Sequence, residues 1–214
     1  MEKSKEIIFI FVKNFFIRKN FQIMKIINKN FYLNLCISNY KKDINSISYI
    51  IKYNLSQSDC IKLGNAIEKV LCDIIINENK NLKDIKPKNK KNFKEKDHLF
   101  IDIKNKQIYY AELKCNLYLD TEKYKNTISK CLEIHYELQN EYKDYNINTY
   151  LVGLRYYNYI DIPINIRKKY RYIDKNLKSC KEYLDELNIG YLIYNKEYYF
   201  EFLNQIAYKM LNNS

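Results

Sequence analysis

The chain has 214 residues, of which 47% are hydrophobic and 29% are charged, and its formal net charge at pH 7 is +12. The hydrophobic content excludes a disordered tail, and the length suffices for one domain with a sizeable core. The excess of positive charge favours a polyanionic partner, most commonly a nucleic acid. The alternative is an AT-rich genome, which enriches Lys, Asn, Ile and Tyr whatever the partner is.

The cysteines and the N-terminus bear on the cell compartment. The six cysteines form no C-x-x-C pair and there are two histidines, so the sequence argues against a structural zinc site and favours buried thiols of a cytoplasmic protein. The apolar run 7–12 is short and is interrupted by Lys13, which predicts neither a signal peptide nor a membrane span. Because Met24 is an alternative start, we interpret 1–23 as an N-terminal extension and 24–214 as a single domain.

The expected elements follow one another without an internal repeat. Apolar spacing, helix caps and breakers predict them in this order: helix 58–77, basic loop 79–96, strand hairpin 97–114, helix 121–144, strand 149–155, irregular segment 156–174, helix 175–187, strand 190–194 and helix 196–211. This order predicts an α/β fold with a mixed central sheet flanked by helices.

The hairpin carries the most informative pattern of the chain. Asp97 opens its first strand, and Glu112-Leu113-Lys114 closes its second strand. With Asn105-Lys106 as a two-residue turn, Leu99 pairs with Glu112 and Asp97 with Lys114. Because alternate residues of a strand share a face, the three charges then gather at the end of an otherwise apolar face, away from the turn. A shift of one residue in the pairing would separate them.

This cluster suits the hydrolysis of a phosphodiester bond. Asp97 and Glu112 are oxygen ligands of the kind that Mg²⁺ prefers, and the Leu113 carbonyl would be a third ligand. Lys114 would hold the attacking water and offset the developing negative charge. The alternative is a cross-strand salt bridge at the surface. A second triplet of the same type, Asp102-Ile103-Lys104, lies beside the turn and has no acid opposite it.

The segment resembles the PD-(D/E)xK nuclease superfamily and, within it, type II restriction endonucleases. The resemblance covers residues 57–155, with Lys96 where that family often has proline. It implies a restriction-endonuclease-like core and Mg²⁺-dependent cleavage of double-stranded DNA at a specific sequence, leaving a 5′-phosphate. It also implies a homodimer and a separate DNA methyltransferase of matching specificity. Family members often add a glutamate from the preceding helix, and Glu68 is that candidate; the alternative is an ordinary solvent-facing glutamate.

The predicted DNA-binding residues form three groups along the chain. The start of a helix, with lysines and threonine, suits phosphate contacts, and arginine favours guanine edges. The groups are Lys88, Lys90 and Lys91 before the hairpin; Asn116, Thr121, Lys123 and Lys125 after it; and Arg155, Arg167, Lys168 and Arg171 among tyrosines. For each group the alternative is a solvated loop. Two other functions remain open: a structure-selective nuclease of repair or junction resolution, and a basic DNA-binding protein without catalysis.

Overall fold

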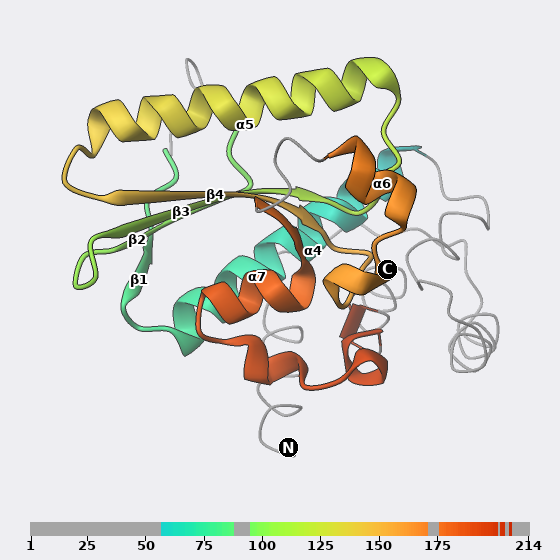
Figure 1. Cartoon of the computed structure of the whole chain (residues 1–214). Coiled ribbons are helices and arrows are strands. Elements are labelled where there is room, and N and C mark those ends of the chain that lie inside the picture. Colours follow the sequence, from blue (N-terminus) through green and yellow to red (C-terminus); the bar gives the residue numbers. More distant parts are fainter. Residues whose placement is uncertain (1–56, 88–94, 171–175, 201, 204–205, 207–214) are drawn as a thin grey trace. The chain divides into compact units, whose positions relative to one another are not determined.

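The structure is a computed structural model that describes residues 57–87, 95–170, 176–200, 202–203 and 206. The chain divides into two compact units (Figure 1). One unit spans Met1–Ile74 together with Gly190–Ser214, and the other spans Ile75–Ile189. The predicted N-terminal extension 1–23 lies outside the described residues.

The second unit is built on a mixed sheet, which has five strands among the residues described (Figure 1). In chain order the strands are β1 (Leu82–Asp84), β2 (His98–Asp102), β3 (Gln107–Lys114), β4 (Asn146–Gly153) and β5 (Leu177–Ser179). They lie side by side in that order, with β1–β2 and β2–β3 antiparallel and β3–β4 and β4–β5 parallel. The predicted α/β fold with a mixed sheet is therefore confirmed.

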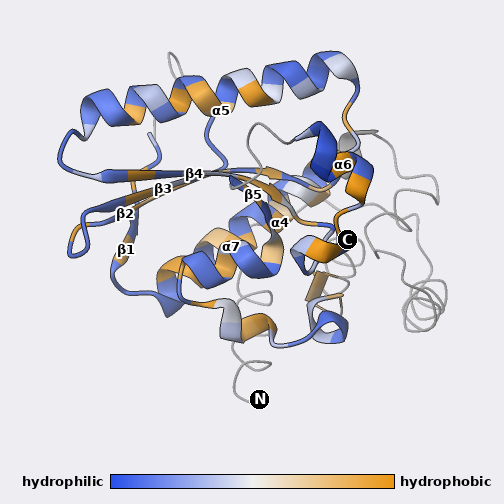
Figure 2. Ribbon diagram, viewed as in Figure 1, coloured by the Kyte–Doolittle hydropathy of each residue, from blue (hydrophilic) through white to orange (hydrophobic). Residues whose placement is uncertain are grey.

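Two helices of this unit lie on opposite sides of the sheet (Figure 1). Helix α5 (Thr121–Glu141) begins at Asp120, whose side chain accepts a hydrogen bond from the Lys123 backbone N–H. Its ribbon is mainly hydrophilic (Figure 2). One stripe at helical spacing packs against apolar residues of β2 and β3, and consists of Cys131, Ile134 and Leu138. Helix α7 (Cys180–Glu186) lies on the other face, where Tyr183 stacks on His98.

The helix predicted over 58–77 is α4 (Gln57–Glu78), and the one predicted over 121–144 is α5. Of two predictions near the C-terminus, the helix over 175–187 is confirmed only in its second half and the strand over 190–194 is wrong. Residues 175–187 contain the short strand β5 before α7, because Ser179 and Glu182 form a capping box that starts the helix at Cys180. Residues 190–194 contain a 3-10 helix, Gly190–Ile193, since so short an apolar run does not distinguish a strand from a helical turn.

The irregular segment predicted over 156–174 contains two short helical pieces. They are the 3-10 helix Tyr159–Asp161 and α6 (Ile164–Lys169). Residues around them form a second apolar cluster in this unit, which includes Leu117, Leu151, Tyr156, Ile166 and Tyr170. The tyrosines of this region are therefore largely core residues rather than an exposed stacking surface.

The β2–β3 hairpin differs from its predicted register by two residues. Asp102, rather than Lys104, pairs with Gln107, so the turn has four residues instead of two. The Asp102 carboxylate accepts hydrogen bonds from the backbone N–H and the side chain of Asn105, at 3.0 and 2.8 Å. Lys106 closes the turn with a φ of 51°. An aspartate that hydrogen-bonds within the turn stabilises this longer loop.

Because the shift is by an even number of residues, every residue keeps its predicted face. Leu99 pairs with Tyr110, and His98 with Ala111. Continuing that pairing places Asp97 opposite Glu112, where the sequence predicted Lys114. The corrected register thus brings the two carboxylates closer to each other than the predicted one.

Candidate active site

The Glu112 carboxylate lies at the end of β3 and is almost completely buried, with 2% of the residue exposed. Its Oε1 accepts a hydrogen bond from Lys114 Nζ at 2.7 Å. Its Oε2 accepts one from the Tyr110 hydroxyl at 3.0 Å and lies 2.6 Å from Lys130 Nζ. A buried carboxylate is stable only when it is paired, and here two ammonium groups and a hydroxyl pair it. This burial argues against an ordinary surface salt bridge.

Asp97 precedes β2 and binds the same end of β3 through its side chain. Its Oδ2 accepts a hydrogen bond from the Leu113 backbone N–H at 2.7 Å. Its own backbone carbonyl accepts one from Lys86 Nζ at 2.7 Å. The Asp97 side chain thus accepts the hydrogen bond that a backbone carbonyl of a paired strand would otherwise accept. This hydrogen bond holds it beside the residue that follows Glu112.

The electrostatics of the site show how closely these groups interact. Burial, reinforced by repulsion from Glu112, raises the pKa of Asp97 to about 6. Burial also raises the pKa of Glu112, but Lys114 and Lys130 outweigh that effect and lower it overall. Burial lowers the pKa of Lys114, yet Glu112 and Asp97 outweigh burial and raise it. The raised pKa of Lys114 favours its charged form, whereas burial and the neighbouring Glu112 disfavour ionisation of Asp97.

The two carboxylates fit a hard divalent cation. Mg²⁺ binds through one or two carboxylates and completes its shell with water and substrate oxygens. The repulsion that raises the pKa of Asp97 is what such a cation would relieve. Within the described part of the chain, no group of three His, Cys, Asp or Glu side chains is arranged to hold a metal ion. A protein-held cation would thus rest on Asp97 and Glu112, with backbone, water or substrate as the remaining ligands.

Two further candidates from the sequence are Glu68 and the second triplet, Asp102-Ile103-Lys104. Glu68 lies in α4, within the unit that holds Met1–Ile74, and its predicted catalytic role stays a prediction. In the second triplet, the Asp102 carboxylate is engaged by Asn105 in the turn. Lys104 is exposed in the turn between β2 and β3, whereas Glu112 lies toward the other end of β3. The structure thus gives this triplet a turn-forming role.

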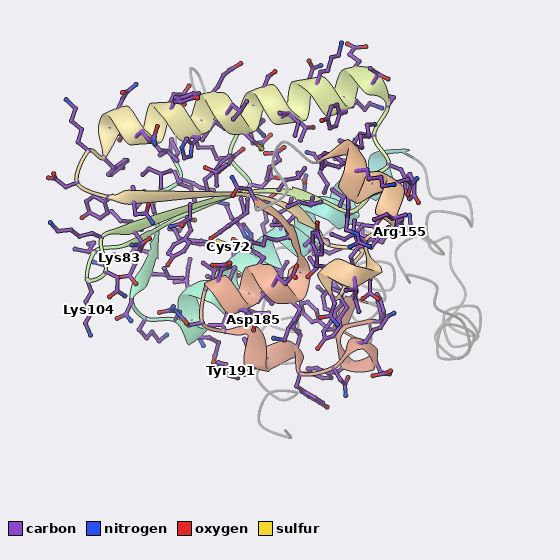
Figure 3. The ribbon with its side chains drawn as sticks, viewed as in Figure 1. Cys72, Lys83, Lys104, Arg155, Asp185 and Tyr191 are labelled. Carbon is purple, nitrogen blue, oxygen red and sulfur yellow. The ribbon has the colours of Figure 1, made fainter. Side chains whose placement is uncertain are left out.

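Two groups of predicted DNA-binding residues lie at the end of the sheet where β3 and β4 terminate. Asn116, Thr121, Lys123 and Lys125 lie on the connection from β3 and on the first turns of α5. Arg155 follows β4, next to Leu154, whose backbone N–H donates to the Lys114 carbonyl at 2.9 Å. In Figure 3 Arg155 and Lys104 lie at opposite ends of the unit. These residues therefore flank the end of the sheet that carries Lys114.

Helix α6 brings Arg167 and Lys168 toward the same connection. The neighbouring Lys169 Nζ donates to the Leu119 carbonyl at 2.6 Å, and the Tyr124 hydroxyl donates to the Lys169 carbonyl at 2.9 Å. Lys168 is exposed, while the Arg167 guanidinium lies 5.2 Å from the centre of the Tyr159 ring. The remaining predicted DNA contacts lie outside the described residues, and are Lys88, Lys90, Lys91 and Arg171.

Two groups that bind Glu112 were not among the predicted site residues. Lys130 borders the buried stripe of α5, one residue before Cys131 and three after Thr127. A lysine at that position, in the helix that follows the hairpin, was a usable signal. Tyr110 precedes Glu112 by two residues and so shares its face, which the alternation of the strand already showed.

No family model, no curated protein and no solved structure matches this chain. The resemblance to PD-(D/E)xK nucleases therefore stays a prediction from the sequence. Among the residues that the structure describes, no helix is both long enough and apolar enough to cross a membrane.

Proposed function

We propose that this protein is a Mg²⁺-dependent nuclease that hydrolyses phosphodiester bonds of double-stranded DNA. One observation carries the proposal: the Asp97 carboxylate accepts a hydrogen bond from the backbone N–H of Leu113, the neighbour of Glu112 in β3, and Lys114 Nζ lies 2.7 Å from Glu112 Oε1. Two carboxylates and an ammonium group in this arrangement suit phosphodiester hydrolysis. That reaction requires neutralisation of the phosphate charge and activation of a water molecule.

Each side chain has a distinct task in this proposal. Asp97 and Glu112 would hold Mg²⁺, which neutralises the phosphate and lowers the pKa of a bound water molecule. Tyr110 orients Glu112 through its hydroxyl. Lys114 has 29% of its side chain exposed, so its ammonium group has access to a substrate while it contacts Glu112. It would position the attacking water and stabilise the charge that develops on the phosphate.

The basic residues around this site support DNA as the substrate. The connection after β3, Arg155 and the end of α6 all place cationic side chains near Lys114, in a chain with a net charge of +12. Within this class we propose a type II restriction endonuclease that leaves a 5′-phosphate. A palindromic target would then require a twofold symmetric homodimer, and a separate DNA methyltransferase would protect the host.

Digestion of plasmid and phage DNA tests the proposal, with Mg²⁺ and with EDTA. The informative variant is Glu112→Gln, which removes the carboxylate charge and keeps the side-chain size. Asp102→Asn is the matched control, because it makes the equivalent change at the other end of the same hairpin. We expect Mg²⁺-dependent cleavage by the wild type and by Asp102→Asn but not by Glu112→Gln. Equal cleavage by all three proteins would refute the site.

The form of the products separates the alternatives. Discrete bands would establish a sequence-specific endonuclease. A smear that depends on Glu112, or preferential cutting of branched DNA, would favour the repair or junction-resolving nuclease. Intact DNA in every digestion, together with salt-sensitive binding, would favour the DNA-binding protein without catalysis.

A further inference from the structure

Lys130 lies in the middle of α5 and reaches the end of β3, where its Nζ is 2.6 Å from Oε2 of Glu112. The same oxygen accepts the Tyr110 hydroxyl, and Oε1 accepts Lys114 Nζ. Both carboxylate oxygens of Glu112 are therefore engaged by donors of the protein itself. A divalent cation that uses Glu112 as a ligand must compete with these donors.

Both lysine side chains are partly exposed, Lys114 at 29%, and what distinguishes Lys130 is the element from which it reaches Glu112. It belongs to a different element from Glu112, whereas Lys114 lies two residues away on β3 itself. Its side chain is 24% exposed, compared with 3% for Glu112. Since a lysine side chain is a compact charge on a flexible stem, it can turn toward solvent or toward a ligand at the surface.

The charge of the cluster indicates when this movement is favourable. With Asp97, Glu112, Lys114 and Lys130 all ionised, the four formal charges cancel, so the cluster offers a divalent cation no excess of negative charge. A DNA phosphate offers Lys130 a new partner for a strong, charge-assisted hydrogen bond. Once Lys130 binds that phosphate, Oε2 of Glu112 keeps only the Tyr110 hydroxyl and has room for a cation, and Asp97, Glu112 and Lys114 together have a net negative charge.

We propose that Lys130 is a positioning residue that occupies Glu112 in the absence of DNA and transfers to a phosphate when DNA binds. The metal ion and the DNA are then taken up together. This inference rests on the proposed nuclease function and adds a coupling to it. By linkage, the metal ion must strengthen DNA binding by the same factor by which DNA strengthens metal binding.

The test measures binding of Mn²⁺ to the full chain without DNA, from the loss of the electron paramagnetic resonance signal of free Mn²⁺. Lys130→Met keeps most of the stem and removes the competing charge. We expect it to raise Mn²⁺ affinity by about tenfold, at the lower end of measured couplings between close charge pairs. Lys130→Arg keeps the charge and should stay near the wild type. Lys104→Met removes one charge at the hairpin turn and should leave Mn²⁺ affinity unchanged.

A second series adds a non-cleavable DNA duplex. The affinity for Mn²⁺ should rise on DNA addition in the wild type and should rise much less in Lys130→Met, in which the competing ammonium group is already absent from Oε2 of Glu112. In the double variant Lys130→Met with Glu112→Gln, the gain in Mn²⁺ affinity should disappear. Circular dichroism checks folding, and Lys130→Gln replaces Lys130→Met should that variant not fold.

The two proposals fail in different ways. An unchanged Mn²⁺ affinity in Lys130→Met, while the wild type still binds Mn²⁺ through Glu112, would overturn the role of Lys130 and leave the nuclease proposal standing. An equal gain in Lys104→Met would also overturn it, because the effect would then be one of overall charge. Mn²⁺ binding that is independent of Glu112 in every protein, with and without DNA, would overturn both proposals.

Discussion

At the scale of single residues, Glu112 is the centre of the site because three side chains from two elements bind its carboxylate. Its interaction with two lysines has a practical consequence. Removal of either lysine leaves the other one paired with Glu112, so the buried carboxylate is not left as an uncompensated charge. Single lysine variants should therefore fold and report on function.

The first prediction concerns Lys114. We expect Lys114→Ala to abolish cleavage and to leave DNA affinity within a few-fold of the wild type, because its proposed role is to act on the reacting phosphate and because Lys130 still pairs with Glu112 in the free protein. Cleavage and binding of one labelled duplex measure the two effects. Lys104→Ala, from the other triplet of the hairpin, is the control and should cleave normally. Cleavage retained by Lys114→Ala would show that this lysine has no catalytic role.

The second prediction concerns the stability of the metal-free protein against pH. The pKa of Asp97 is raised from 3.8 to about 6 in the folded state, so in this interval the folded state binds more protons than the unfolded state. The stabilisation that comes from proton binding at Asp97 is complete below pH 3.8 and is lost as pH rises through about 6. This loss lowers the free energy of unfolding by about 2–3 kcal/mol.

Urea unfolding of the wild type and Asp97→Asn across this range measures that contribution. Asparagine keeps an oxygen that can accept from Leu113 but does not ionise. We expect the variant to gain stability over the wild type as pH rises to neutrality. An identical pH dependence in the two proteins would contradict the repulsion between Asp97 and Glu112.

At the scale of elements, the site depends on how closely the end of β4 approaches its neighbours. Gly153 pairs with Lys114 across β3 and β4. A Cβ at this position would lie 2.7 Å from Leu117 Cδ1 and 2.7 Å from Tyr156 Cδ2. Atoms of the apolar cluster thus occupy the space that any other residue would need.

The third prediction follows from this packing. Gly153→Ala should destabilise the protein by about 1–3 kcal/mol, as overpacked cores do, and should also reduce cleavage because the strand beside Lys114 must move. The midpoint of urea unfolding measures the first effect. Gly153→Ala should cost less free energy of unfolding when it is added to Leu117→Ala than when it is added to the wild type, because the shorter side chain leaves room for the new Cβ. An unfolding midpoint equal to that of the wild type would show that the cluster yields without strain.

The elements also show what the sequence can and cannot predict. Alternation along β2 and β3 was enough to place Asp97 and Glu112 on one face, because a strand repeats every two residues. The length of the turn was not predictable from that pattern, because it depends on the hydrogen bonds of Asp102 to Asn105. The strands β1 and β5 have three residues each, too few for any periodicity. Lys130 joins the site only through the packing of α5.

At the scale of the whole molecule, we expect the DNA to contact one end of the sheet. The predicted DNA-binding residues that the structure describes lie around the end of the sheet that carries Lys114. The fourth prediction compares two cations at opposite ends of the unit, Arg155 and Lys104 (Figure 3). We expect Arg155→Ala to weaken DNA binding and to reduce the slope of log affinity against log salt by about one, and Lys104→Ala to change neither.

Fluorescence anisotropy of a labelled duplex, titrated over a range of salt concentrations, provides both values. The wild type should lose about a hundredfold or more in affinity between roughly 50 and 200 mM salt. Equal effects of the two variants would mean that the DNA contacts the protein without preference for this end of the sheet. Circular dichroism confirms that both variants are folded.

The hydrogen bond from the Leu113 N–H to Asp97 gives the site a native spectroscopic probe. In protein labelled with the heavy nitrogen isotope, the Leu113 amide resonance reports directly on the carboxylate that it binds. Its chemical shift should follow the ionisation of Asp97 during an acid titration, and it should change again when a diamagnetic divalent ion is added. This backbone amide thus allows the ionisation of Asp97 and the binding of a metal ion to be followed without adding a substrate.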